Sequence, residues 1–294
     1  MAGQGNMEKV GRRPNATKPR TRRRRWFQFS LRTALAGTFL WAVVLGLWSV
    51  YLAPFQRQKA AIVRLRERGI PRWTYDRSAQ LPRWIAWILG DESFNQAARG
   101  VWLPEGIGDE DLAEMEADLA SLPWLRDLEI QNSHVTDEGL RHLARLVTIE
   151  NLHIYGAAVR GEGFRHLAGF GRLRMVTTQR TPLSDEALYW LGRHPTLEAL
   201  ALEDTELTNG GLLHLDGLVN LGFLQVRSPR ITDAGLANVL GVSGLVKLDL
   251  RGTSATEGGL VPLKALPKLR LLRVPGHEVE LREGRWESFP SKAK

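Results

Sequence analysis

Three histidines at a fixed spacing are the first candidates for chemistry in this chain. His142, His166 and His214 occupy equivalent positions, because the intervals between them are 24 and 48 residues. A zinc ion needs ligand atoms at ~2.0–2.1 Å, whereas neighbouring strands of a repeat lie ~4.8 Å apart, so stacked side chains do not converge. We therefore expect the ladder to be a product of duplication, with no metal site.

A cluster of six acidic residues between Asp109 and Asp118 is the second candidate. Carboxylates bind Ca²⁺, but a dedicated loop needs a D-x-D-x-D-G spacing that this segment lacks. Acidic residues also stabilise the amino end of a helix. The segment is thus predicted to be a solvated acidic helix.

Other catalytic patterns are missing from the sequence. It contains no G-x-S-x-G, P-loop, G-x-G-x-x-G or H-E-x-x-H motif, and no cysteine. We predict a protein that is not an enzyme, with no catalytic residues and no cofactor. An active site within the irregular segment 72–111 is the one catalytic alternative that we keep.

A repeat of 24 residues must position whatever surface the chain presents. Leucine or isoleucine opens each unit, at Leu125, Ile149, Leu173, Leu197, Leu221, Leu245 and Leu269. A fixed period of this length is typical of stacked solenoid repeats, in which each unit buries its apolar side chains against the next.

One unit, residues 197–220, predicts the local structure. Leu200 and Leu202 alternate with smaller or polar residues, as in a strand with one buried face. Thr208 is placed to cap a helix. Apolar residues then recur at a spacing of three, which favours a short, tight helix packed against the strand. The segment between Leu112 and the next unit, which opens at Leu125, is longer than the corresponding segment of the other repeats. The helix within that segment should therefore be about one turn longer than the helices of the other repeats.

These residues resemble the leucine-rich repeat family, and in particular its bacterial type with a T-D-x-G-L turn. Full copies of the motif begin at Thr136 and Thr232, and looser copies at Ser184, Thr208 and Thr256; the copy at Arg160 departs from the motif. The resemblance covers about half of the chain. It implies an α/β solenoid with parallel strands on a concave face and short helices on a convex face. In the family an inward turn position holds Asn or Cys, and here it is occupied by Ser133, Ala157, Thr181, Thr205, Pro229, Thr253 and His277. The hydroxyls among them are expected to bond the turn backbone, and the turns at Ala157 and Pro229 to be looser.

A binding surface is expected on the concave face, where the residues between the buried leucines project. Its first row is acidic, its last rows are mainly basic, and aromatic residues lie between. Solenoids bind through such faces, and a few aromatic and arginine residues usually dominate the binding energy. The predicted partner-binding residues are Glu129, Tyr155, Met175, Glu203, Phe223, Arg227, Lys247 and Arg251.

Before the repeats lies a basic and then an apolar segment. Positions 1–75 hold 16 Lys and Arg and 2 acidic residues, against 24 and 30 in positions 76–294. The acidic repeat region argues against nucleic acid. No charged residue occurs from Thr33 to Phe55, which is enough to cross a bilayer as a helix. A signal sequence is the rival interpretation. The basic run Arg22–Arg25 favours an amino terminus in the cytoplasm and a repeat domain outside it.

The predicted organisation therefore has five parts. Residues 1–30 form a basic disordered tail, 31–55 a transmembrane helix, 56–98 a juxtamembrane stalk and N-terminal cap, 99–281 the repeat domain, and 282–294 a polar tail that frays. Basic residues flanking the span are expected to contact anionic lipid. Trp73, Trp84 and Trp87 are assigned to the cap rather than to a membrane-dipping patch.

The predicted function is that of a membrane-anchored module that binds a protein or peptide. The alternative is a structural or envelope-organising spacer that self-associates through its acidic and basic ends.

Overall fold

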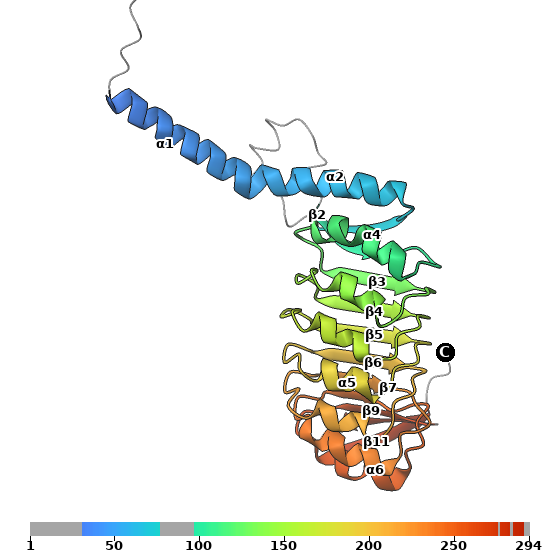
Figure 1. Ribbon diagram of the computed structural model, residues 1–294. Helices are drawn as coiled ribbons and strands as arrows, with labels where there is room; N and C mark the ends of the chain where they lie inside the picture. The colour runs from blue at the N-terminus through green and yellow to red at the C-terminus, as the bar shows by residue number, and fades with distance from the viewer. Residues whose placement is uncertain (1–30, 77–96, 276, 283–284, 291–294) are drawn as a thin grey trace, which may run out of the picture. The chain divides into compact units, whose positions relative to one another are not determined.

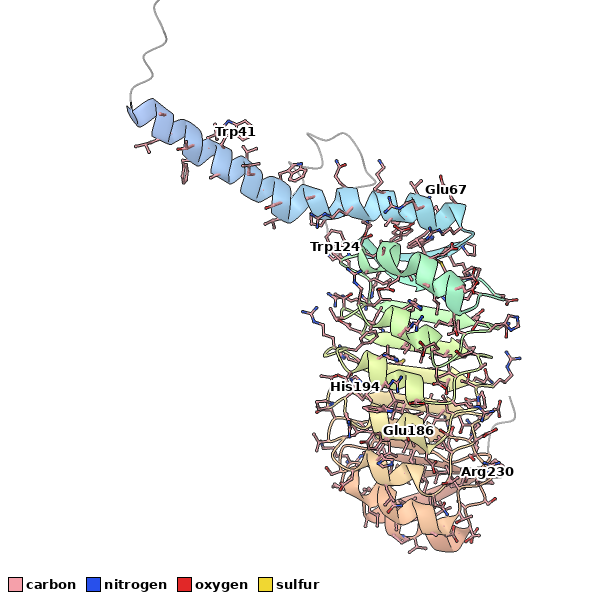
Figure 2. The ribbon with its side chains drawn as sticks, in the orientation of Figure 1. Trp41, Glu67, Trp124, Glu186, His194 and Arg230 are labelled. Carbon is pink, nitrogen blue, oxygen red and sulfur yellow. The ribbon has the colours of Figure 1, made fainter. Side chains whose placement is uncertain are left out.

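The computed structural model describes residues 31–76, 97–275, 277–282 and 285–290. The chain divides into two compact units, Met1–Leu47 and Trp48–Lys294. In the first unit the described element is helix α1, Leu31–Leu47. Its apolar side chains are exposed, including Leu35, Phe39 and Trp41 (Figure 2). The basic tail predicted for 1–30 lies outside the described residues.

The second unit is built on one sheet whose strands follow in chain order (Figure 1). Strands β2 to β9 run parallel, whereas β1, β10 and β11 are antiparallel to their neighbours. The strands are β1 Arg72–Asp76, β2 Ala97–Trp102, β3 Asp127–Gln131, β4 Asn151–Tyr155, β5 Met175–Gln179, β6 Ala199–Glu203, β7 Phe223–Val226, β8 Lys247–Asp249, β9 Leu271–Val274, β10 His277–Arg282 and β11 Arg285–Pro290.

A short helix or 3₁₀ turn follows each of the parallel strands β2 to β8 on the other side of the sheet. The first, α4 at Asp109–Ala120, is the longest of them, as predicted from the position of Leu112. The others are η3 Gly139–Leu143, η4 Glu162–Leu167, α5 Asp185–Leu191, η5 Gly211–Leu215, α6 Asp233–Leu236, η6 Ala237–Gly241, α7 Glu257–Leu260 and η7 Pro262–Ala265.

The 24-residue period sets the strand register. Asp127 pairs with Asn151, which pairs with Met175, and the same step continues to Leu271. The alternate leucines of each strand point inward and are fully buried, for example Leu200 and Leu202 at 0% exposure. Because the register advances by one whole repeat at each strand, equivalent side chains form straight rows across the sheet.

In most repeats a side-chain oxygen of one turn, usually from a carboxylate, fixes the turn of the next repeat. Asp185 accepts hydrogen bonds from the backbone N–H of Thr208 at 2.8 Å and from its hydroxyl at 2.5 Å. Asp233 bonds Thr256 in the same way, and Asn209 accepts the N–H of Thr232 at 2.9 Å. The Thr208 hydroxyl in turn accepts the Gly210 N–H at 3.1 Å within the turn. The prediction that Thr208 caps the helix is wrong, because Gly210 is the N-cap of η5 and no side chain caps this 3₁₀ helix.

The glycine of each motif makes room for that carboxylate. A Cβ on Gly211 would lie 2.5 Å from Asp185 Oδ1, and one on Gly259 would lie 2.2 Å from Asp233 Oδ1. At one junction, between the irregular copy of the motif at Arg160 and the copy that follows it, both the acid and the glycine of this contact are replaced. Gly161 replaces the acid, and Ala187 replaces the glycine that would face it. A Cβ on Gly161 would lie 2.4 Å from the Ala187 backbone nitrogen and 2.9 Å from the Ala187 Cβ, so the backbone and methyl of Ala187 leave no room for a side chain at this position.

The inward turn position satisfies the backbone at some repeats and not at others. Thr181 donates its hydroxyl to the Gln179 carbonyl at 3.2 Å, and Thr253 to the Leu250 carbonyl at 2.7 Å, as expected. The expectation is wrong for Ser133 and Thr205, whose buried hydroxyls have no partner among the described residues. At Pro229 the preceding residue, Ser228, supplies the missing hydroxyl and donates to the Leu207 carbonyl at 2.6 Å.

Helix α2, Ala53–Glu67, covers the first repeat, where the sequence predicted a stalk. Leu65 is fully buried, and the centroids of the Phe55 and Trp124 rings lie 4.4 Å apart. Figure 2 labels Trp124 below α2. Arg64 of α2 donates a hydrogen bond to the carboxylate of Asp118 in α4 at 2.7 Å. The exposed apolar run therefore ends before Ala53, within the π-helical segment η1, Trp48–Leu52, rather than at residue 55.

Both ends of the sheet carry antiparallel strands. Trp73 lies in β1 and packs partly buried against the core, which agrees with its predicted place in the cap. Trp84 and Trp87 lie outside the described residues. At the other end β10 contains the predicted edge strand and pairs with β11, so residues 285–290 form a strand where a fraying tail was expected.

Candidate functional site

The strand face consists of the outward side chains of β3 to β9, three rows of residues that stand opposite the helices. The row that begins each strand reads Asp127, Asn151, Met175, Ala199, Phe223, Lys247 and Leu271. It changes from polar to apolar and then to basic as it crosses the sheet. Six of the eight predicted partner-binding residues belong to this face, whereas Arg227 and Arg251 follow the ends of β7 and β8. The eight residues do not form one site.

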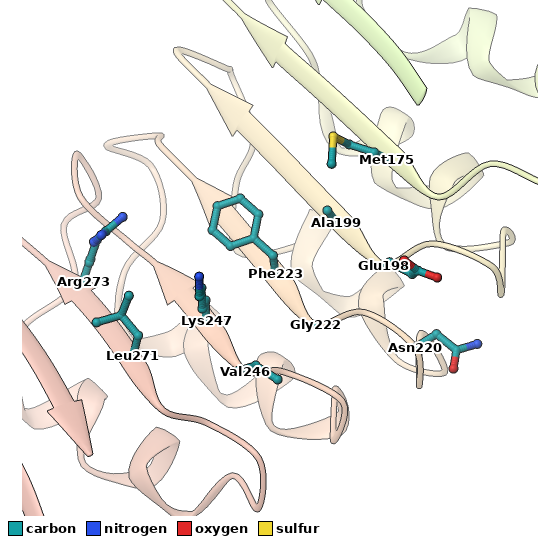
Figure 3. Close-up of a pocket in the computed structure, with 10 residues that line it drawn as sticks. All are labelled: Met175, Glu198, Ala199, Asn220, Gly222, Phe223, Val246, Lys247, Leu271 and Arg273. Carbon is teal, nitrogen blue, oxygen red and sulfur yellow. The ribbon is translucent and has the colours of Figure 1, made fainter. Parts of the chain in front are cut away.

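Three of them meet in a depression of about 660 Å³ over β5 to β9. Figure 3 shows Met175, Phe223 and Lys247 rising from separate strands toward this space. Sequence reasoning placed Ala199, Leu271 and Arg273 on the same face without selecting them. The 24-residue step would have identified the first two, because they share the row with Phe223. The full lining is Met175, Glu198, Ala199, Asn220, Gly222, Phe223, Val246, Lys247, Leu271 and Arg273.

The predicted basic anchors are partly engaged within the protein. Arg227 forms an ion pair with Glu203 at 2.9 Å. Arg251 donates from Nε and Nη2 to the Asp249 carboxylate, at 3.0 and 2.6 Å, and the Asp249 side chain is only 2% exposed. These contacts stabilise the sheet face. Replacing Arg251 would leave a buried carboxylate without its main counter-ion, which makes it a poor probe of binding.

A second, smaller hollow lies at the acidic end of the face. It measures about 310 Å³ and is bordered by Asp127, Glu129 and His153, together with residues of β1 and β2. The His153 and Tyr155 rings stack at 6.2 Å. Burial lowers the pKa of His153, although Glu129 and Asp127 act in the opposite direction. Burial, followed by the charges of Glu129 and Glu203, raises the pKa of the Tyr155 phenol.

The three equivalently placed histidines, His142, His166 and His214, each contact a different type of residue. His142 contacts Glu116 at 3.0 Å, His166 accepts from Arg165 at 3.2 Å, and the His214 ring packs against Tyr189 at 5.3 Å. No group of three His, Cys, Asp or Glu side chains suited to a metal ion occurs in residues 31–76, 97–275, 277–282 and 285–290.

The acidic cluster has structural roles that the sequence did not reveal. Asp109 accepts the Thr136 N–H at 2.9 Å, which begins the series of carboxylate-to-turn contacts. Asp111 accepts the Gly108 N–H at 2.7 Å at the start of α4. Asp118, expected to be solvated, is 7% exposed and pairs with Arg64 at 2.6 Å and Arg68 at 3.5 Å.

A charged ladder also precedes the strands. Arg126 pairs with Glu150, and Arg174 donates two hydrogen bonds to Glu198 at 2.9 and 2.8 Å. The Glu198 carboxylate at the edge of the larger depression is therefore already neutralised. The remaining charge at that depression is positive.

The comparisons with known proteins concern the fold. No family model and no curated protein matches the chain. Among solved structures, an internalin (inlF) from Listeria monocytogenes aligns with 17% identity and a TM-score of 0.40, covering 53% of this chain. The alignment spans only 51% of that internalin. Internalin C2 (inlC2) from the same organism aligns with 14% identity and a TM-score of 0.47, covering 65% of this chain and 90% of its own.

Those likenesses are too distant to support an argument about function. The leucine-rich repeat solenoid fold follows from the structure itself, through its parallel strands in a 24-residue register, its buried leucines and its short helices.

Proposed function

We propose that this protein is a membrane-anchored, non-catalytic module whose leucine-rich repeat domain binds a protein or peptide through the strand face. The observation that carries the proposal is the row from Met175 to Leu271, which is apolar and basic where a solvated sheet face would be polar. Exposed apolar surface next to charged groups is typical of binding sites. The net negative charge of the repeat region favours a protein or peptide over nucleic acid.

The anchor is supported by the apolar helix near the amino terminus. One helical stretch, Ala34–Glu67, is long and apolar enough to cross a membrane, and its most apolar part is unburied. A signal sequence meets the same criterion. We favour an anchor because the uncharged run is longer than the usual 7–15 residues of a signal peptide core. Anionic lipid contacts are proposed for the basic residues before position 31, since Arg64 and Arg68 are paired with Asp118.

The repeat type proposed is the bacterial one with the T-D-x-G-L turn. Its support is physical, because the acid and the glycine of the motif meet across four repeat junctions, with Asp109, Asp137, Asp185 and Asp233 as the acids. The same proposal places the amino terminus in the cytoplasm and the repeat domain outside it.

Site-specific crosslinking tests the binding face. A photoreactive phenylalanine analogue is placed at Thr177 on β5 or at Leu213, which is 58% exposed on the helix side. Under illumination of intact cells, the first position should give a crosslinked partner and the second should not. Crosslinks from Leu213 alone would move the site to the helices and refute the proposal for the strand face.

Self-association remains a second candidate function. Its supporting observation is the change from Asp127 and Asn151 at one end of the row to Lys247 at the other. The internal pairing of Arg227 and Arg251 reduces the charge available for it. Sedimentation of the detergent-solubilised protein distinguishes the two functions, because a concentration-dependent oligomer that is lost in Lys247→Glu would favour self-association.

A further inference from the structure

One part of the larger depression, above Ala199, has room for an apolar side chain. Ala199 lies in the row between Met175 and Phe223, and its small side chain leaves a hollow between two larger ones (Figure 3). Met175 is 37% exposed, so its side chain forms an accessible wall. The volume of about 660 Å³ lies within the range of ligand sites, roughly 300–1,000 Å³.

The charge beside this hollow selects for an anion. Lys247 is exposed, follows Phe223 in the row, and has no ion-pair partner within the described part of the chain. Arg273 lines the same depression from β9, but it is engaged within the protein, with Asp249 at 3.9 Å among its contacts. Since Glu198 is held by Arg174, Lys247 is the charged group of the depression that a ligand can pair with.

The spacing of the row fits an extended peptide that crosses the strands. Strands lie ~4.8 Å apart, and an extended chain advances ~6.7 Å for every second residue. An apolar side chain over Ala199 therefore places the side chain two residues away between β7 and β8. That position is within reach of the Lys247 ammonium group.

We propose that this depression binds an extended segment of a partner protein in which a large apolar side chain and a carboxylate lie two residues apart. The inference rests on the proposed function and assigns it a ligand chemistry. The apolar side chain occupies the hollow between Met175 and Phe223, and the carboxylate pairs with Lys247.

Selection from a random heptapeptide library displayed on phage tests this assignment, with the full chain in detergent micelles as target. Enriched peptides should carry Leu, Ile, Met or Phe two positions from Asp or Glu. The enriched peptide, made synthetically, should bind Lys247→Glu at least about tenfold more weakly. Lys264→Glu makes the same charge change on the exposed helix side and should leave the affinity unchanged.

Other outcomes separate this inference from the function beneath it. Peptides that are weakened by Tyr155→Ala but not by Lys247→Glu would overturn the subsite while supporting the strand face. No enrichment, or enrichment without the two-residue spacing, also overturns the subsite. If the crosslinks come from Leu213 alone, both proposals fail. Phe223→Ser provides a second variant, which tests the hollow for the apolar side chain. Unchanged thermal unfolding of each variant shows that its fold is intact.

Discussion

Glycine at the motif position is required by a neighbour and not by its own backbone angles. A Cβ on Gly211 meets Asp185 at 2.5 Å, and the carboxylate is held by two bonds to Thr208. Gly211→Ala should therefore lower the free energy of unfolding by about 1–3 kcal/mol. Gly171→Ala, where a Cβ has nothing within 4 Å, is the control and should be close to neutral. Chemical denaturation measures both, and equal effects would contradict the contact.

The exchanged pair at Gly161 and Ala187 predicts a coupling between two residues 26 positions apart. Gly161→Asp alone should destabilise strongly, because Gly161 has a φ of +136° and a Cβ there would lie 2.4 Å from the Ala187 backbone nitrogen and 2.9 Å from its Cβ. Ala187→Gly removes only the contact with the Cβ, so in that background the same change should remain destabilising but cost less, with a coupling energy of about 0.5–1 kcal/mol. A double-mutant cycle in denaturant gives this number. Additive effects would show that the two residues do not share one space.

The stability of the repeat domain is predicted to be sensitive to acid, because a buried histidine lies in the repeat that opens at Leu173. His194 is 5% exposed, and burial lowers its pKa below 6.5 even though its hydrogen bond to the backbone carbonyl of Phe170 acts in the opposite direction. The unfolded chain therefore binds more protons below pH 6.5, so stability should fall as the pH decreases from 7 to 5. His194→Gln should reduce this fall in the Tm. His153 shares the direction of shift and accounts for a residual slope.

Asp233 provides the contrast that identifies the histidine effect. Hydrogen bonds from Thr256 lower its pKa below 3.8, so its contribution is present above that value and is lost only in stronger acid. A Tm that fell equally in His194→Gln and in the parent between pH 7 and 5 would assign the sensitivity to another group.

At the scale of elements, helix α2 decides where the folded domain begins. Leu65→Ala removes a fully buried side chain and should cost about 2–5 kcal/mol, while Val63→Ala on the same helix, 50% exposed in the parent, should cost little. Hydrogen exchange of the β1 and β2 amides reports the same effect locally. Equal tolerance of both changes would restore the interpretation of this helix as a free stalk.

The sequence predicted the repeating elements well because their cause is local. Leu200 and Leu202 alternate within one strand, and the same interval recurs along the chain, so strand, turn and short helix follow from spacing alone. The longer α4 followed from counting residues after Leu112. Partners distant in the sequence were not predictable in this way. The burial of Leu65 and the pairing of Asp118 with Arg64 join segments more than 50 residues apart that share no period.

The sequence predicted the face of the sheet that carries the candidate site, but not the position of the site on that face. The period located Met175, Phe223 and Lys247 on one row, but composition could not show that Glu203 and Arg227 bond each other. Ala199 contributes to the depression because its side chain is small, so a search for large or charged side chains does not find it.

At the scale of the whole molecule, the absence of cysteine from the sequence allows the topology to be tested directly. Arg172→Cys, at an exposed position of the repeat domain, should react with a membrane-impermeant maleimide added to intact cells. Ala16→Cys in the basic tail should react only after lysis, because positively charged flanks remain in the cytoplasm. The opposite labelling would invert the orientation. Release of the intact protein by alkaline carbonate would contradict a membrane span.

The carboxylate-to-turn contacts have a direction. The acceptor at Asp109, Asp185 or Asp233 always comes earlier in the chain than the N–H that it binds. A ribosome releases the amino end first, so each newly made turn meets an acceptor that has already emerged. The solenoid can thus be extended one unit at a time during translation, with the earlier unit serving as the template for the next.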